Sequence, residues 1–158
     1  MGGLKLKAII ERETFLPIFA KVAQAVPNRT TIDAWFKVRM SCENGVAIIH
    51  ANSGDLIVSA KPPGVAIERE GACLIPPKEF MQILRDSTAD QVGLEIVGDA
   101  LVITSGRDEF KLNLHRDTGE FGKPPEFSAG SYVSMQGEAL SHALRSASAC
   151  AGEEGRFA

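Results

Sequence analysis

The chain contains, at residues 8–22, the stretch AIIERETFLPIFAKV, in which a strand-like apolar run leads directly into the pattern of an amphipathic helix. The helical part repeats apolar residues at the three- and four-residue spacing of one helix face: Phe15, Ile18, Phe19 and Val22. Pro27 ends this pattern because proline cannot continue a helix. We therefore expect a strand over residues 4–11 and a helix over residues 13–26.

The same pattern begins again 125 residues later, where Glu138 repeats Glu13. Apolar positions coincide between the two copies: Ala8 with Val133, Ile10 with Met135, Phe15 with Leu140, Ile18 with Ala143, Phe19 with Leu144 and Val22 with Ala147. Self-similarity at a fixed spacing indicates consecutive copies of one unit. We expect one complete module over residues 1–126. Residues 127–158 would then hold a linker and the first strand and helix of a second, truncated copy.

The residues between and after the helices of the first module predict antiparallel strands. Alternating or continuous apolar runs mark them at residues 35–42, 46–51, 55–60, 65–68, 72–75, 92–96, 101–103 and 110–114. Asn44-Gly45 is a strong signal for a two-residue hairpin turn. A second helix opens at Pro76-Pro77 and carries Glu79 in its first turn. This order is not an alternating βαβ pattern, so we predict an α+β domain with two helices on one face of antiparallel sheets.

Composition excludes several classes of protein. The net charge of −3 argues against a surface that is basic all over, so any nucleic-acid contact must be local. No apolar run reaches membrane-spanning length and no signal peptide is recognisable, so we expect a cytoplasmic protein. The spacing of Cys42, Cys73 and Cys150 fits neither a disulfide framework nor a zinc site. We expect these cysteines to be buried hydrophobic residues, and we expect no metal site.

Basic and amide side chains gather on the polar sides of the predicted helices. The first helix offers Lys21 and Gln24; the second offers Lys78, Gln82 and Arg85; the third, in the second copy, offers His142 and Arg145. Acidic residues fall mainly in first turns or at a helix end. Two interpretations remain open at this point. These are ordinary solvated helix faces, or they form a surface that faces phosphates without reading bases.

Short motifs in a fixed order resemble the bacterial DNA polymerase III beta subunit, the sliding clamp. They are IERETFL at residues 10–16, Arg29, IPPKEF at residues 75–80, LVITSGR at residues 101–107 and FKL at residues 110–112. The resemblance covers residues 4–126 as the first clamp domain and residues 131–158 as the start of the second. It includes GEEGRF at residues 152–157, which is similar to an acidic stretch of the family. A clamp is built from three like domains, which agrees with the repeat.

The resemblance implies a subunit that closes head to tail with another copy into a ring around duplex DNA. Helices line the hole, and DNA polymerase III and clamp-loader subunits bind the complete protein outside. Binding would be independent of sequence, non-catalytic and without a cofactor. Arg29 matches a DNA-contact position of the family, and the helix side chains named above would face the hole. Strong phosphate contacts would hinder sliding, so a few basic and amide groups suffice.

The resemblance also implies a subunit interface on this module. Phe110 and Leu112 match the strand that pairs with the third domain of a neighbour, Ile83 matches an adjacent apolar helix position, and Arg107 matches a charged rim position. Glu109 departs from the basic residue of the family pattern. The family's partner-binding pocket lies between its second and third domains. The resemblance covers only the first domain and the start of the second, so we interpret this chain as an N-terminal fragment.

Two other classes of function are weighed against the clamp. His50, Ser53 and Asp55 are close in sequence, but no hydrolase, P-loop or dinucleotide motif accompanies them, and strand and turn positions explain them more simply. The second alternative is a non-enzymatic protein-interaction module without a DNA role, whose helix faces are merely solvated.

Overall fold

The computed structural model describes residues 5–114, 121–122 and 133–151, and the chain forms two compact units, Met1–Pro124 and Pro125–Ala158. The helices of the first unit are α1 (Arg12–Ala23), the 3₁₀ helix η1 (Asp33–Phe36) and α2 (Pro77–Asp86). Its strands are β1 (Lys7–Glu11), β2 (Val38–Glu43), β3 (Val46–Asn52), β4 (Ile57–Ala60), β5 (Val65–Arg69), β6 (Gly71–Ile75), β7 (Gln91–Val97), β8 (Ala100–Ser105) and β9 (Asp108–Asn113). The second unit contains α3 (Gly137–Ser148).

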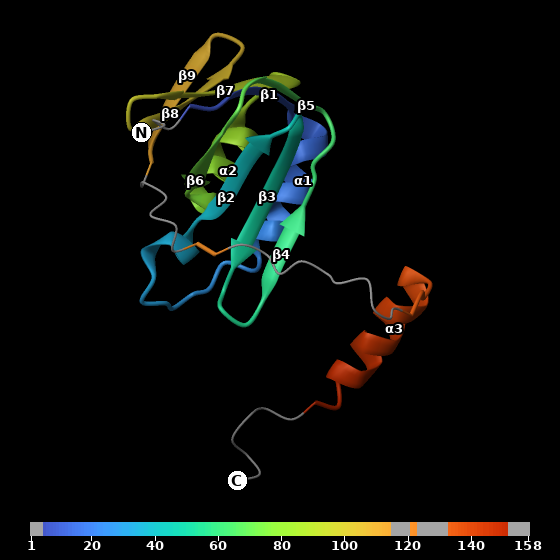
Figure 1. Ribbon diagram of the computed structural model, residues 1–158. Helices are drawn as coiled ribbons and strands as arrows, with labels where there is room; N and C mark the ends of the chain where they lie inside the picture. Colours follow the sequence, from blue (N-terminus) through green and yellow to red (C-terminus); the bar gives the residue numbers. More distant parts are fainter. Residues whose placement is uncertain (1–4, 115–120, 123–132, 152–158) are drawn as a thin grey trace. The chain divides into compact units, whose positions relative to one another are not determined.

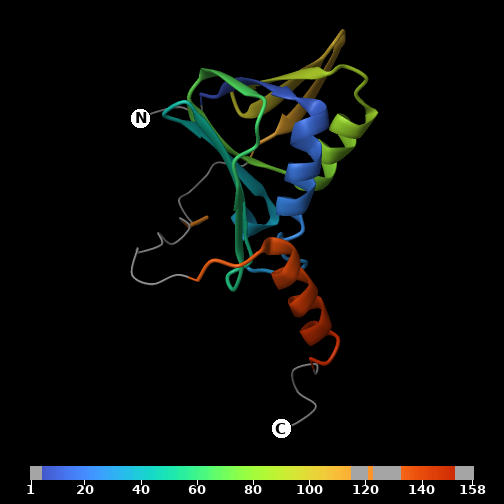
Figure 2. The same cartoon turned by 90° about the vertical axis from the view of Figure 1, so that its right-hand side faces the viewer.

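The strands of the first unit form two sheets, in the orders β5-β1-β7-β8-β9 and β4-β3-β2-β6. Every pairing in both sheets is antiparallel. Figure 1 looks onto the sheet of β2, β3 and β4 with α1 and α2 behind it, and Figure 2 shows both helices on the same side of that sheet. The predicted α+β class, with two helices on one face of antiparallel sheets, is confirmed.

The turn between β2 and β3 is the predicted hairpin. Glu43 lies opposite Val46, which leaves Asn44 and Gly45 as the two loop residues. Their φ angles are 52° and 72°, in the left-handed region that a type I′ turn requires at both positions. Asparagine and glycine tolerate this conformation better than other residues, and they thereby fix the register of the pair.

The core lies between the two helices and the two sheets. Aromatic residues of α1 and α2 fill its centre, and Phe15, Phe19 and Phe80 are fully buried. Alternate residues of the strands complete it: Ala8, Ile10, Met40, Ile49, Val92, Leu94, Leu101 and Ile103. The period-two patterns of the sequence therefore place the expected sides of the strands inside.

The prediction of one strand over residues 35–42 is wrong at its start. Residues 33–36 form η1, in which the N–H of Trp35 donates to the carbonyl of Ile32 at 3.0 Å and the N–H of Lys37 donates to that of Ala34 at 3.1 Å. Trp35 packs against a small cluster that contains Leu74 and Phe121. Tertiary packing of the indole therefore overrides the strand propensity of the Trp-Phe pair, and β2 begins only at Val38.

Two further boundaries differ from the predictions. Helix α1 ends at Ala23, because the N–H groups of Ala25 and Val26 donate to carbonyls only three residues back and continue the chain as a turn. Strand β4 begins at Ile57 because Ser53 and Leu56 close a turn, in which the N–H of Ser53 donates to the Leu56 carbonyl at 2.9 Å.

Helix α3 repeats α1 at the spacing of the sequence repeat, since both ends lie 125 residues further along the chain (12 to 137, and 23 to 148). The strand expected before it is not formed over residues 133–136, where a strand would need a hydrogen-bonded neighbour. Residues 127–132, where the linker is predicted, and the motif at 152–157 lie outside the described residues. No described residue of α3 is buried, and Leu144 is 60% exposed.

Candidate nucleic-acid interface

Helices α1 and α2 form one layer that three phenylalanine rings hold together. The ring of Phe80 in α2 lies 4.9 Å from that of Phe19 and 6.3 Å from that of Phe15, between ring centroids. Phe15 and Phe19 are themselves stacked at 5.9 Å. Burying these rings fixes which sides of both helices face the core, and therefore which sides face away from it.

The opposite side of this layer carries the polar residues that the sequence predicts for DNA contact. All five of those on the two helices are exposed: Lys21, Gln24, Lys78, Gln82 and Arg85. Arg29, in the segment after α1, is exposed as well. Lys21 and Arg85 each lie in the last turn of a helix, where a cation also interacts favourably with the helix dipole. We define these five helix residues together with Arg29 as the helix-layer face.

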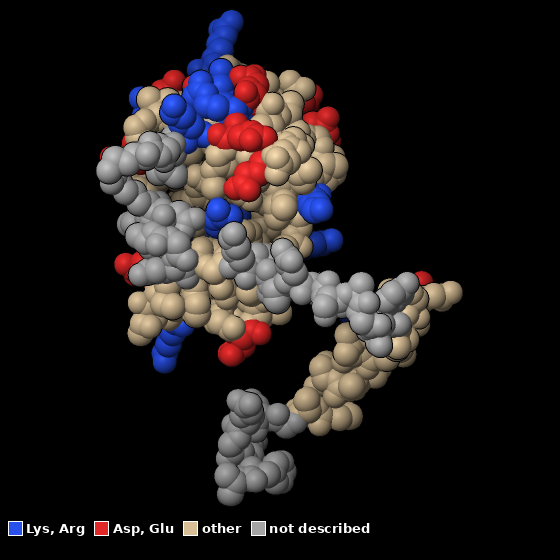
Figure 3. Space-filling model, in the orientation of Figure 1, with Lys and Arg blue, Asp and Glu red and all other residues tan. Residues whose placement is uncertain are grey.

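Acidic residues moderate the charge of the helix-layer face. Glu79 lies in the first turn of α2, and Asp86 ends that helix and accepts a hydrogen bond from Gln82 Nε2 at 2.9 Å. The layer is therefore only mildly basic. Figure 3 shows the sheet side, where basic and acidic residues lie next to one another. In the five-stranded sheet, Lys7 Nζ of β1 is 3.0 Å from Glu68 Oε2 of β5, and the hydrogen bond between them raises the pKa of Lys7.

His142 and Arg145 lie on α3, in the second compact unit. Both are exposed. The structure thus brings together the predicted residues of α1 and α2 in one layer. His142 and Arg145 belong to the other compact unit, and their contact with DNA stays a prediction.

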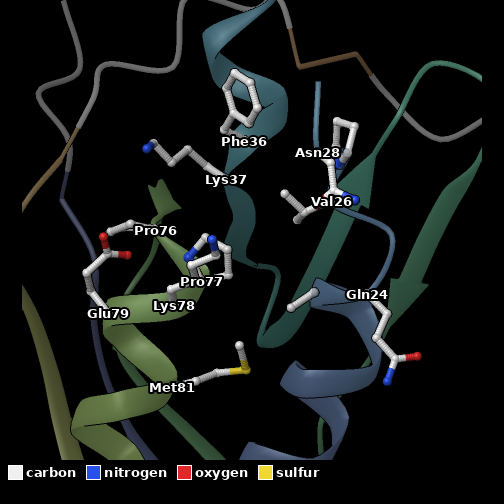
Figure 4. A pocket seen from close by; sticks show the side chains of 12 residues that line it. Gln24, Val26, Asn28, Phe36, Lys37, Pro76, Pro77, Lys78, Glu79 and Met81 are labelled. Carbon is white, nitrogen blue, oxygen red and sulfur yellow. The ribbon is translucent and has the colours of Figure 1, made fainter. Parts of the chain in front are cut away.

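A pocket of about 490 Å³ opens between the end of α1 and the start of α2. Figure 4 shows α1 and Gln24 on one side, α2 with Pro77, Lys78 and Met81 on the other, and Phe36 at one end. The sequence patterns do not predict this pocket, because they place Phe36 and Lys37 within a strand. No local motif predicts the bend of the chain at η1, and this bend places both residues at the pocket.

The residues predicted for a subunit interface gather at one edge of the larger sheet. Strand β9 is the last strand in the order and pairs with β8 alone among the described strands. Its Phe110 and Leu112 are half-buried and pack against the core. Ile83 packs against the same core from α2, and the helix α2 is in contact with strand β9. Arg107 is exposed in the turn before β9. Glu109 Oε1 lies 3.2 Å from Lys111 Nζ, within the same strand.

His50 and Ser53, which were considered for an enzymatic site, make contacts that are typical of structural residues. His50 is 3% exposed, and its ring meets that of Phe121 edge to face at 4.8 Å. The hydroxyl of Ser53 accepts a hydrogen bond from the Leu56 N–H at 3.2 Å, within the turn before β4. These contacts agree with the simpler interpretation of both residues as parts of a strand and a turn.

The residues that the structure describes contain neither a metal-binding cluster nor a membrane-spanning helix. In that part of the chain, no group of three or more His, Cys, Asp or Glu side chains is arranged to hold a metal ion. None of the described helices is long and apolar enough to cross a membrane. Cys42 and Cys73 are buried as predicted, whereas the prediction is wrong for Cys150, which is exposed and follows α3, a helix in which no described residue is buried.

Comparisons with solved structures place this fold among bacterial sliding clamps. The chain matches the sliding clamp of Bacillus subtilis with a TM-score of 0.82 and 21% identity, over 89% of this chain and 39% of that one. It matches the DNA polymerase III beta chain of Streptococcus pneumoniae with a TM-score of 0.85 and 18% identity, over 96% of this chain and 42% of that one. The beta sliding clamp of C. crescentus matches with a TM-score of 0.68 and 27% identity, over 81% and 34%.

This chain therefore spans about two fifths of the length of the B. subtilis and S. pneumoniae proteins. No curated protein matches its sequence significantly. The family model described as "DNA polymerase III beta subunit, N-terminal domain" matches residues 6–121, which include both helices of the layer and all nine of the described strands. The chain belongs to the DNA polymerase III beta subunit family, the sliding clamps, whose N-terminal domain it contains.

Proposed function

We propose that this chain supplies the first domain of a DNA sliding clamp, a non-catalytic, cytoplasmic processivity factor that encircles duplex DNA. The observation that carries the proposal is the helix-layer face, in which exposed cations and amides of α1 and α2 lie opposite the aromatic contacts that join the helices. Family membership and the 125-residue repeat support it.

The moderate charge of the layer suits sliding. Each phosphate that a protein neutralises steepens the dependence of binding on salt, and bidentate contacts to bases would hold the protein at one sequence. Three helix cations, Lys21, Lys78 and Arg85, are offset in part by Glu79 and Asp86. Such a surface attracts the backbone of any duplex weakly, so retention would depend on enclosure.

Enclosure requires more chain than the two units seen here. We propose that the complete gene product forms a head-to-tail homodimer, with β9 at the seam and Ile83, Arg107, Phe110 and Leu112 beside it. DNA polymerase III and clamp-loader subunits would be partners of the complete protein. Edge strands present unpaired backbone donors and acceptors, which makes β9 suited to pairing with a neighbour.

Topological binding can be tested on a nicked circular duplex. The complete gene product, loaded by a clamp loader, should stay on the circle through gel filtration and leave it after the DNA is cut once. Retention after linearisation would contradict the proposal and favour a surface binder. A failure to associate with DNA, together with tight capture of another protein, would favour the alternative of an interaction module.

The helix-layer face can be tested by removing its charge. In the triple variant Lys21→Gln/Lys78→Gln/Arg85→Gln, we expect weaker duplex binding at low salt and a salt slope lower by at most about 1 for each residue. Lys61→Gln is the matched control, since Lys61 is exposed in the segment after β4 and outside the layer. Equal effects of the control and the triple variant would exclude a role for the layer.

A further inference from the structure

The pocket between α1 and α2 has a composition that the helix-layer face does not explain. Its volume of about 490 Å³ falls within the range of small-molecule sites, about 300–1,000 Å³. The lining divides about equally between apolar and polar surface. Its apolar residues come from three segments: Ala23, Val26, Pro27, Phe36, Pro76, Pro77 and Met81.

Phe36 is the aromatic residue of this lining. It is half-buried, and it belongs to neither of the two hydrophobic clusters of the first unit. Met81, also half-buried, lies across the pocket on α2 (Figure 4). An aromatic ring with an accessible face is the side chain on which an unstacked nucleobase binds, independently of which base it is.

Two cations stand at the rim. Lys78 is exposed and Lys37 is half-buried, and neither ammonium group forms an ion pair within the described ranges. The single acidic residue of the lining is Glu79. The rim is therefore positive on balance, and the complementary ligand joins a flat apolar group to an anion.

The position of the pocket selects among such ligands. Gln24 and Lys78 belong both to its lining and to the helix-layer face, so the pocket opens where the proposed function places DNA. In a duplex the bases are stacked and paired, and reaching them requires unstacking. A single strand offers both an exposed base and a phosphate at short spacing.

We infer that this pocket binds one unstacked nucleotide of single-stranded DNA, with its base against Phe36 and its phosphate at Lys37 and Lys78. The inference rests on the proposed function for the placement of DNA at this layer. It adds to that function a site that distinguishes single-stranded from duplex DNA. Such a site would hold the chain at a junction where a single strand leaves the duplex.

The test compares two strands that differ only in their bases. Fluorescence anisotropy of the 158-residue chain is measured with a labelled oligothymidylate and with an abasic strand of equal length. We expect the oligothymidylate to bind at least about fivefold more tightly, as one stacked base contributes. Phe36→Leu, which keeps an apolar side chain, should remove this difference, whereas Lys61→Gln should preserve it. Equal affinities for the two strands would overturn the inference.

A second measurement does not depend on any variant. In a ¹H–¹³C spectrum of the wild-type chain, thymidine 5′-monophosphate should shift the Met81 methyl signal by the ring current of a bound base. The methyl signals of Met40, which is buried in the core, should not move. An unmoved Met81 signal at saturating nucleotide would refute the site. Displacement of the oligothymidylate by an acidic peptide that itself shifts the Met81 signal more strongly would assign the pocket to a protein partner instead.

These outcomes separate the inference from the proposed function. Retention on circular duplex and release by linearisation test enclosure and need no contact in the pocket. A protein that passes that test but binds both strands equally would be a clamp without this nucleotide site. A chain that prefers the oligothymidylate but never encloses DNA would keep the pocket and lose the proposed function.

Discussion

The rings of Phe19 in α1 and Phe80 in α2 lie 4.9 Å apart between centroids, with an angle of 56° between their planes. Both residues are fully buried. This contact joins two helices that are separated by five strands in the sequence. It determines how far apart the cations on the opposite sides of the helices lie, so the aromatic core sets the geometry of the helix-layer face.

Phe80→Ala should destabilise the first unit by about 3–5 kcal/mol, because it removes a buried ring and leaves a cavity beside Phe15 and Phe19. The measurement is urea unfolding followed by circular dichroism. Leu144→Ala is the control, since Leu144 is 60% exposed and its loss should change the free energy of unfolding by less than about 0.5 kcal/mol. Similar losses in both variants would contradict this account of the core.

A methyl group at residue 71 should be poorly tolerated. A Cβ atom built on Gly71 would overlap the backbone carbonyl of Lys5, and backbone cannot move aside as a flexible side chain can. We expect Gly71→Ala to lower the free energy of unfolding by about 1–3 kcal/mol. Gly93→Ala is matched to it, because its Cβ would lie 3.7 Å from Thr104 Cβ, an ordinary contact. A loss as large in Gly93→Ala would show that the overlap is not the cause.

Local sequence patterns predicted most of the fold, because turns and helix starts are determined mainly by residues that are close together in the sequence. Asn44-Gly45 specifies a turn, and the turn fixes the register of β2 and β3. The paired prolines before α2 predicted where that helix begins, and the structure places Pro77 at its first residue. Trp35 gave the wrong prediction because the contact that holds it, with Leu74 and Phe121, is distant in sequence. No window around residue 35 contains those partners.

The candidate site, too, was predicted from the sequence only in part. Helix periodicity predicted that Lys21 and Lys78 would be exposed, and the structure places both on one layer. The pocket could not be predicted, because its lining combines the end of α1, the bend at Phe36 and the start of α2. Only tertiary structure brings these segments together. The resemblance to sliding clamps, for its part, named functional positions but not this pocket.

Cysteine reactivity should follow burial. Burial raises the pKa of Cys42 to about 11 and that of Cys73 to about 12, so neither forms a thiolate at neutral pH, whereas Cys150 is exposed. At pH 8 we expect a thiol reagent to modify Cys150 rapidly and the other two only after unfolding. Cys150→Ser should abolish the rapid phase. Rapid modification that persists in this variant would contradict the buried positions.

The same two thiols predict a loss of stability at high pH. Their folded-state pKa values lie above the ordinary value of 9.0, so the unfolded chain releases protons that the folded chain retains. The stabilising contribution is complete below about pH 9 and is lost as the pH rises towards 11 and 12. Urea unfolding across this range should show a decline that is smaller in Cys42→Ala than in the wild type, each measured against its own value at pH 7.

Phe110→Arg should weaken the proposed homodimer. Phe110 lies on the edge strand β9 and is only partly buried within the unit, so a charge there would enter an apolar seam between subunits. In the complete gene product, sedimentation velocity should show monomers at concentrations where the wild type is dimeric. Leu56→Arg is matched in chemistry, because Leu56 is an apolar residue that is 54% exposed just before β4, a strand of the other sheet. An unchanged dimer in folded Phe110→Arg and Leu112→Arg proteins would exclude β9 as the seam, whereas dissociation of Leu56→Arg as well would mean that any added charge has this effect.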